Sequence, residues 1–534
     1  MPASKNSKNS RTSKPKKKSA PRSRRGASGH EHYSPGAALA VLCGAALSSA
    51  IAIWWCFAHG YILYYGDAQA HLAIARRMID SRTPGFEQIG TVWLPLPHLL
   101  MLPFVRFDSL WRTGLAGAIP SGLCFVAATG FLFGAVRRTF HSTTSGVTAA
   151  MIFALNPNIL YLQSIPMSES PFLACFTGLI YFLVRFHTNH RPIWAALAGL
   201  MAMGGTMCRY DGWFLLPFIA LYFLIFGGHE RWPALSLFTI IAAIGPLFWF
   251  GHNLYYNGNA LEFYNGPYSA KAIQGGKPYP GQHDWLTAIR FYADAAKLNT
   301  GWPLAILGLI GAVVSFARRK WLGLSLLLFP ITFYLLGIHS TGNPVWTPAL
   351  YFDSYYNTRY GLAFLPFCAF AASSMVAGRW RRTIATVVII LSSIPWIAYP
   401  KAESWITWKE SQVNSRHRRA LETEAAEYMK IHYKPGDGLL MPFSDVVGIA
   451  REAAIPLRDT IHEGNGVLLY AAMARPALFP FGKWAIGIAG DTVSSRVGVW
   501  SRRGLYWDCV KIVEVKGAPP IEIYRRRSTS QIHR

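Results

Sequence analysis

The sequence predicts a mainly α-helical protein that crosses a membrane about 11 times and ends in a small extracytoplasmic α/β domain. Of the 534 residues, 52% are hydrophobic and only 15% are charged, whereas roughly a quarter of an ordinary soluble domain is charged. Apolar runs recur between residues 37 and 399, and a run of roughly 20 such residues crosses the hydrocarbon core of a bilayer. This composition excludes both a single soluble globule and disorder over most of the chain.

The N-terminal segment, residues 1–33, carries ten Lys or Arg side chains and one acid, Glu31. It is rich in Ser and has no apolar periodicity, so we expect a disordered basic cytoplasmic tail. Contact with anionic lipid headgroups or nucleic acid is the lesser alternative for the tail. Much of the remaining net charge of +26 lies in short loops between apolar runs, where it sets topology. We therefore expect membrane lipids, and no nucleic acid, as partners.

The apolar runs predict eleven spans in a transmembrane domain, residues 34–400. With the tail inside, every second loop is basic, as the positive-inside rule requires. An odd number of spans then places residues 401–534 outside the plasma (inner) membrane and leaves the N-terminus cytoplasmic. The predicted spans are 37–59, 113–136, 144–162, 171–186, 192–208, 213–228, 234–253, 302–317, 321–338, 360–377 and 383–399.

Residues 401–534 predict a soluble extracytoplasmic α/β domain. A charged helical stretch at 416–431 is followed by short β-like runs, and this alternation is typical of a small α/β fold. The β-like runs are 438–443, 484–489, 507–515 and 521–524. The seven cysteines of the whole chain show no metal-ligand spacing and are interpreted as small hydrophobic residues.

Candidate site residues gather in the loops predicted to lie outside. Ionisable side chains at the membrane edge are costly and are functional candidates by default. Asp67 follows the first span and precedes a predicted interfacial helix, 68–79. Taken by itself, Asp67 could simply be the N-cap of that helix. The other candidates precede the fourth span or follow the fifth and ninth: Glu169, Arg209, Asp211, Arg359 and Tyr360.

Five short motifs occur in this order: Gly66-Asp67, Trp93 to His98 (WLPLPH), Met167-Ser168-Glu169, Arg209 to Gly212 (RYDG) and Thr358-Arg359-Tyr360. Together they resemble the GT-C membrane glycosyltransferases, which include the protein O-mannosyltransferases and the aminoarabinose transferases that act on lipid A. The resemblance covers approximately residues 37–400, and an appended soluble domain is also typical. It implies a GT-C-like fold and transfer of a sugar from a polyprenyl-phosphate-linked donor to an acceptor hydroxyl on the outer face, usually with inversion.

The resemblance also implies roles for individual residues. Asp67 matches the position of the general base, although the family often has a second acid where this chain has Ala68. Glu169 matches the acid of the second outer loop, where it assists Asp67 or contacts the acceptor or a divalent ion. Arginine suits a leaving phosphate because its planar fork matches two phosphate oxygens. Binding of the donor phosphate or sugar is therefore assigned to Arg359 first, then to Arg209, Tyr360, Asp211 and Lys271.

Lys271 lies in a long outer loop, residues 255–302, whose aromatic residues and glycines are typical of a lid. An interfacial aromatic belt is the other interpretation of this loop.

No cofactor is certain from the sequence. Asp67, Glu169 and His71 would form an oxygen-rich site if a divalent cation such as Mg, Mn or Zn were used. Lipid, glycan and protein acceptors are all compatible with the motifs. Two other function classes stay open: a lipid-linked sugar transporter or flippase without transfer activity, and a membrane-anchored binding protein. A transporter predicts internal repeats and polar groups near the midplane, whereas the sequence shows no repeat and its polar residues crowd one edge.

Overall fold

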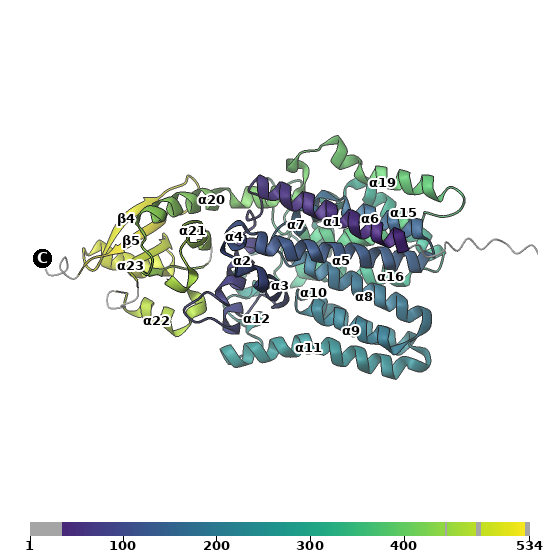
Figure 1. Ribbon diagram of the computed structural model, residues 1–534, viewed down its shortest axis with the longest axis horizontal. Helices are drawn as coiled ribbons and strands as arrows, with labels where there is room; N and C mark the ends of the chain where they lie inside the picture. Colours follow the sequence, from purple (N-terminus) through teal and green to yellow (C-terminus); the bar gives the residue numbers. More distant parts are fainter. Residues whose placement is uncertain (1–34, 444–445, 477–481, 529–534) are drawn as a thin grey trace, which may run out of the picture.

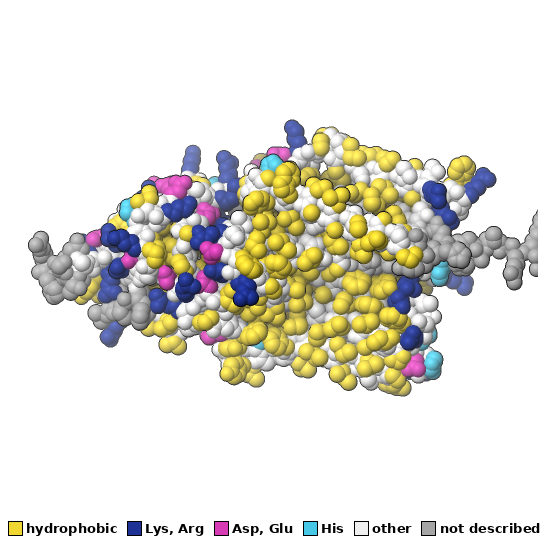
Figure 2. Space-filling model, viewed as in Figure 1, with side chains coloured by type: hydrophobic (Ala, Val, Ile, Leu, Met, Phe, Trp, Pro, Cys, Tyr) yellow, Lys and Arg dark blue, Asp and Glu magenta, His cyan; other side chains and the backbone are white. Residues whose placement is uncertain are grey.

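The computed structural model describes residues 35–443, 446–476 and 482–528. The predicted tail, residues 1–33, lies outside these ranges. Figure 1 shows a bundle of helices joined end-on to a smaller domain that contains the sheet. Hydrophobic side chains cover the flank of the bundle, and charged side chains gather over the smaller domain and at the far end of the bundle (Figure 2). This distribution supports an integral membrane protein, because lipid-facing surfaces must be apolar.

The bundle is built from long apolar helices that pack through small residues. At Gly311 of α15, an added Cβ would lie 2.1 Å from the carbonyl oxygen of Ala371 in α18, so only glycine lets these two helices meet. The bundle helices are α1 (Pro35–Ala58), α5 (Leu115–Phe140), α6 (Thr143–Ala154), α7 (Pro157–Gln163), α8 (Glu169–Asn189), α9 (Pro192–Thr206), α10 (Asp211–Phe226), α11 (Arg231–Asn257), α14 (Trp285–Thr300), α15 (Trp302–Ala317), α16 (Leu322–Leu327), α17 (Phe329–Ser340), α18 (Phe364–Ser373) and α19 (Arg381–Ala398).

The predicted count of eleven spans is not confirmed. In the described residues, six helices are long and apolar enough to cross a membrane, or up to eight if each of two bent pairs is one span. One predicted span, 144–162, bends by 67° between α6 and α7, because Pro157 starts a new helix after the capping residue Asn156. Two other predicted spans form the shorter helices α9 and α10, and the run 360–377 divides between a 3-10 helix and α18.

Short helices lie between the bundle and the smaller domain. The predicted interfacial helix 68–79 is observed as α2 (Gly66–Arg77), followed by α3 (Leu96–Val105) and α4 (Asp108–Thr113). Leu72 of α2 and Trp111 of α4 belong to the same buried cluster as Ile449 and Ile523 of the smaller domain. The two parts of the molecule therefore share a hydrophobic core. The remaining short helices of the bundle half are η1 (Phe86–Ile89), η2 (Gly228–Glu230), α12 (Glu262–Asn265), α13 (Ala270–Gln274), η3 (Thr358–Ala363) and η4 (Ala402–Ser404).

The smaller domain contains a five-stranded sheet in the order β2-β1-β3-β5-β4. β1 (Leu439–Leu440) pairs in parallel with β2 (Thr460–Ile461) and β3 (Trp484–Ile488). β5 (Ile521–Arg526) lies antiparallel between β3 and β4 (Trp507–Val513). All four predicted β-like runs contain a strand, while the two-residue β2 was not predicted. The helices of this domain are α20 (Ile406–His432), α21 (Val447–Glu452), η5 (Leu457–Asp459), η6 (Glu463–Asn465), α22 (Val467–Ala474) and α23 (Thr492–Arg502).

The helix α20 belongs to both parts of the molecule. Near its start, the backbone N–H of Thr407 donates to the Oδ1 atom of Asn158 at 3.1 Å, and the Ser411 hydroxyl lies 2.7 Å from that of Tyr161. Near its end, Met429 is buried in the core of the sheet domain. One continuous helix thus carries side chains from the sheet to the edge of the bundle.

Candidate active site

The first turn of α2 places Asp67 at the edge of the bundle. Arg418 of α20 donates to the backbone oxygen of Tyr64 at 2.6 Å. Its Nη1 atom would lie 3.1 Å from a Cβ at position 66, so Gly66 leaves room for the guanidinium. One turn further along, Gln69 donates to Glu422 of α20 at 3.1 Å. These contacts fix the start of α2 against α20 and leave the Asp67 side chain 40% exposed.

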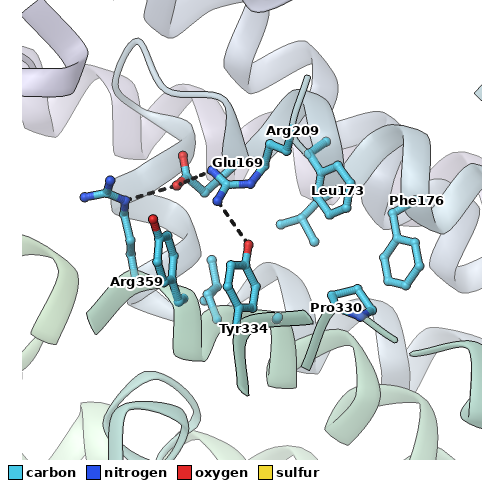
Figure 3. Close-up of a pocket in the computed structure, with 11 residues that line it drawn as sticks. Glu169, Leu173, Phe176, Arg209, Pro330, Tyr334 and Arg359 are labelled. Carbon is cyan, nitrogen blue, oxygen red and sulfur yellow. Dashed lines mark hydrogen bonds and ion pairs between the residues drawn. The ribbon is translucent and has the colours of Figure 1, made fainter. Parts of the chain in front are cut away.

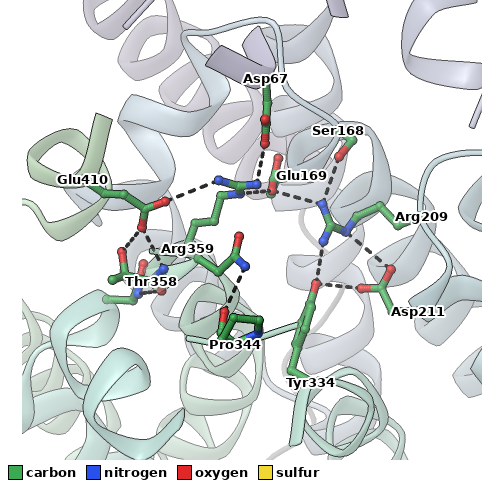
Figure 4. Close-up of polar contacts among 12 residues, drawn as sticks. Asp67, Ser168, Glu169, Arg209, Asp211, Tyr334, Pro344, Thr358, Arg359 and Glu410 are labelled. Carbon is green, nitrogen blue, oxygen red and sulfur yellow. Dashed lines mark hydrogen bonds and ion pairs between the residues drawn. The ribbon is translucent and has the colours of Figure 1, made fainter. Parts of the chain in front are cut away.

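Arg359, on η3, contacts three carboxylates (Figure 4). Its Nη2 atom lies 2.5 Å from Oδ2 of Asp67, its Nε atom 3.2 Å from Oε1 of Glu169, and its Nη1 atom 3.3 Å from Oε1 of Glu410. Glu410 is fixed in turn by Thr358, whose backbone N–H donates to Oε2 at 2.7 Å and whose hydroxyl also donates. Burial raises the pKa of Glu410, and Arg359 opposes that rise.

Arg209 is the centre of a second group of polar contacts, beside the group around Arg359. It donates to the Ser168 hydroxyl at 2.9 Å, to Oε1 of Glu169 at 3.0 Å and to the Tyr334 hydroxyl at 3.1 Å. Its Nε atom lies 3.4 Å from Oδ1 of Asp211, and Tyr334 donates to the other oxygen of that carboxylate at 2.9 Å. Arg209 is therefore anchored on both sides.

Glu169 connects the contacts of Arg359 with those of Arg209, because both arginines contact its Oε1 atom. Its Oε2 atom is buried and has no hydrogen-bond partner among the described residues. Beneath the arginines lies the ring of Tyr360, with guanidinium carbons 5.6 Å (Arg359) and 5.7 Å (Arg209) from its centroid. Tyr360 stacks on Tyr334 at 4.5 Å. Two planar cations held side by side over one aromatic ring can bind an anion bidentately once it displaces one of their carboxylate partners, such as Asp67.

Two cavities meet at Arg359. The apolar cavity, between α8 and α17, has a volume of about 20 Å³ and is lined by Glu169, Arg209 and Arg359 on one side and by apolar side chains on the other (Figure 3). Its apolar lining includes Phe172, Leu173, Phe176 and Pro330.

The polar cleft, between the bundle and the sheet domain, has a volume of about 500 Å³. It is lined by Asp67, Glu410, Arg359 and further residues of α20. Arg359 is thus part of the wall that separates an apolar space from a polar one.

Most of the predicted site residues come together in this cluster. Asp67, Glu169, Arg209, Asp211, Arg359 and Tyr360 are linked by direct contacts. Lys271 is not among them: it lies on α13 with an exposed side chain.

The structure does not bring His71 together with Asp67 and Glu169 as metal ligands. Its Nδ1 atom lies 2.8 Å from Nε2 of His98, and its ring stacks on Trp93. Burial lowers the pKa of His71 to about 4. Within the described ranges, no three His, Cys, Asp or Glu side chains are placed to hold a metal ion. The available carboxylates face guanidinium groups instead, so the residues present do not fit the predicted cation site.

Two residues of the cluster, Glu410 and Tyr334, were not predicted from the sequence. Glu410 lies on α20 before the predicted charged stretch 416–431, and other acids of this helix, such as Glu424, are exposed. Nothing in the spacing of Glu410 distinguishes it from them. Tyr334 lies inside an apolar run that was interpreted only as a span. A tyrosine hydroxyl inside an apolar helix needs a hydrogen-bond partner, and this requirement was the one signal in the sequence that could have pointed to Tyr334.

Comparisons with known proteins support the fold. Residues 110–256 match the dolichyl-phosphate-mannose-protein mannosyltransferase family. The fold is similar to that of ArnT from Cupriavidus metallidurans in the apo state, with a TM-score of 0.54, 13% identity and coverage of 89% of this chain and 97% of that one.

The same protein bound to undecaprenyl phosphate gives a TM-score of 0.50 at 11% identity, over 90% of this chain and 98% of that one. No curated protein matches the chain in sequence. The predicted resemblance is confirmed: the chain has the fold of the GT-C membrane glycosyltransferases, and its central segment matches their mannosyltransferase family.

Proposed function

We propose that the protein is a glycosyltransferase that moves a sugar from a polyprenyl-phosphate donor to an acceptor hydroxyl on the extracytoplasmic side of the membrane, with inversion. One observation carries the proposal: the Arg359 guanidinium borders both the apolar cavity and the polar cleft and contacts Asp67 and Glu169. A membrane-bound donor and a polar acceptor can therefore meet at a single residue. The shared fold with ArnT, which has been solved with undecaprenyl phosphate, supports this donor class.

The donor phosphate is proposed to bind Arg209 and Arg359, with Asp211 and Tyr334 fixing Arg209 and Tyr360 lying beneath both. The prenyl chain would follow the apolar cavity between α8 and α17. At about 20 Å³ that cavity holds about one water molecule, so the two helices must move apart to admit the chain. Lys271, outside the cluster, is proposed to reach the phosphate only after movement of the 255–302 loop.

The proposed reaction is a single displacement. The acceptor oxygen attacks the anomeric carbon, the bond from that carbon to the phosphate oxygen breaks, and polyprenyl phosphate leaves with the electron pair. The acceptor proton passes to the Asp67 carboxylate. The incoming phosphate competes for Arg359, which frees Asp67 from its ion pair, while the two guanidinium groups stabilise the charge that develops on the leaving group. Glu169 keeps the arginines side by side. No step is assigned to a metal ion.

A transport function without transfer is not favoured. Its polar groups would line a path near the midplane of the bundle, whereas Asp67, Arg359 and Glu410 line the cleft between the bundle and the sheet domain.

The test is a transfer assay with purified protein, radiolabelled undecaprenyl-phosphate mannose and a cell-envelope extract as acceptor, with the glucose and arabinose donors in parallel. We expect Asp67→Asn to lower transfer by about 10²–10⁴-fold, the usual range for a general base, while binding of undecaprenyl phosphate is retained. Asp353→Asn, the same change at an exposed position of another outer loop, should have wild-type activity. Full transfer by Asp67→Asn would remove it as the base. Label that stays on every carrier with the wild-type protein would contradict the function.

A further inference from the structure

The polar cleft is lined by one face of α20. Residues Glu410, Ser411, Asn414, His417 and Arg418 all border it, and their spacing of three to four residues places them in a row along the helix. Glu410 and Arg418 are committed to contacts with the bundle. Asn414 donates to the backbone oxygen of Tyr355 at 2.7 Å, and its side chain is exposed, as is that of His417. The middle of this row is available to a ligand.

The opposite wall is built from the bundle and the outer end from the sheet domain. Tyr356 and Asp67 face the cleft from the bundle side, and Tyr356 is 48% exposed. The sheet domain contributes Ile488 of β3 and Pro519 of the segment before β5. None of the long lipid-facing helices lines the cleft, so it is entered between the two parts of the molecule, from the aqueous side, and Asp67 lies on its wall.

We propose that the polar cleft binds the acceptor and that the acceptor is a sugar unit whose hydroxyl is presented to Asp67. Its volume of about 500 Å³ lies within the range of about 300–1,000 Å³ of small-ligand sites. An exposed tyrosine ring in the same cleft as an exposed amide and an exposed imidazole provides one apolar platform and several hydrogen-bonding groups, which suits a polyhydroxylated ring. This inference rests on the proposed function for the reaction and adds the acceptor class and the residues that select it.

The cleft can be blocked without disturbing the arginine cluster. In a Cys509→Ser background, which removes the exposed thiol of the sheet domain, His417→Cys is treated with a membrane-impermeant methanethiosulfonate that carries a trimethylammonium group. We expect modification to reduce the rate of transfer by about tenfold or more, because displacing the acceptor by about 1 Å from its reacting position already lowers the rate strongly. Binding of undecaprenyl phosphate should be unchanged. Ala420→Cys is the control, because it is exposed on the same helix and does not line the cleft.

The linkage in the product identifies the acceptor class. We expect label transferred by the wild-type protein to be recovered in a disaccharide after partial acid hydrolysis and reduction. Solvent partition before hydrolysis then separates a free glycan from a lipid-linked one. Label attached to an amino acid, after protease digestion, or to a lipid phosphate would overturn the sugar-acceptor proposal. Unchanged transfer by modified His417→Cys would overturn the cleft as its site. In both cases the wild-type protein still transfers, which distinguishes these outcomes from failure of the proposed function.

Discussion

Arg359 holds the candidate site together, because a single side chain pairs with acids from α2, α8 and α20. We expect Arg359→Ala to lower the free energy of unfolding by about 3–5 kcal/mol, since it leaves buried carboxylates without their partner. Arg359→Lys should fold better yet transfer poorly, because a point charge does not replace the planar fork. Denaturant unfolding in detergent, measured beside transfer, separates the two effects. Equal activity of Arg359→Lys and wild type would contradict the phosphate role.

Glu410 acts on the site through its neighbours and is therefore proposed as a positioning residue. Replacing it with Gln preserves an oxygen that can accept from Thr358, so we expect a small effect on stability. Glu410→Ala leaves the buried Thr358 donors unsatisfied and should cost about 1–3 kcal/mol. Thermal unfolding of the two variants in detergent checks the expected order of their stabilities. A Glu410→Ala variant as stable as wild type would contradict this expectation.

The short motifs led to Asp67, Glu169, Arg209 and Arg359 because each lies at the end of a predicted span. A charged side chain is costly there, so its presence indicates a function. They could not lead to Glu410. Its partners are far away in the chain, and a helix with many charges gives no indication of which of them turns inward.

At the scale of elements, η3 and α14 touch through a glycine. A Cβ added at Gly361 would lie 2.4 Å from the backbone of Ala295, so Gly361→Ala must push η3 away from α14 and shift Arg359 with it. We expect a large loss of transfer and reduced thermal stability. Gly251→Ala on α11, where a Cβ would meet nothing within 4 Å, should behave like wild type. Retained transfer by Gly361→Ala would show that η3 can move without cost.

We expect the stability of the segment before α22 to depend on pH, because it contains the buried His462. His462 accepts at Nδ1 from the N–H of Gly464 and stacks on Phe443, and burial, with a smaller effect of Arg77, lowers its pKa well below 6.5. Its neutral form stabilises the fold above about pH 6.5, and that contribution is lost as the pH falls toward the lower folded-state pKa. Protection factors for hydrogen exchange in residues 460–474, which are corrected for the intrinsic pH dependence of amide exchange, should fall from pH 7.5 to pH 5. His462→Asn should remove this dependence, and an unchanged slope would exclude His462 as its source.

Elements with a strong periodic signal were predicted and those set by long-range contacts were not. The interfacial helix and four strands were found where expected. The two-residue β2 depends on its pairing with β1, which the local sequence does not reveal. The bend between α6 and α7 instead follows from Asn156 and Pro157, a local signal inside a run that was predicted to be one straight span.

At the scale of the whole molecule, the charge pattern predicts how the protein is oriented in the membrane. The basic loops predict a cytoplasmic N-terminus and an extracytoplasmic sheet domain. The exposed Cys509 of that domain should therefore react with an impermeant maleimide in intact spheroplasts, and Cys509→Ser should abolish that signal. Labelling only after permeabilisation would reverse the assigned topology.

The continuity of α20 has a consequence for how such a protein can diversify. Contacts proposed for the carrier come from the bundle, whereas the wall that would meet the acceptor is a row on α20. Under these proposals, substitutions at Asn414 and His417 of that row would change which acceptor is modified, while the arginine pair would keep its carrier. The two specificities can thus evolve separately within one chain.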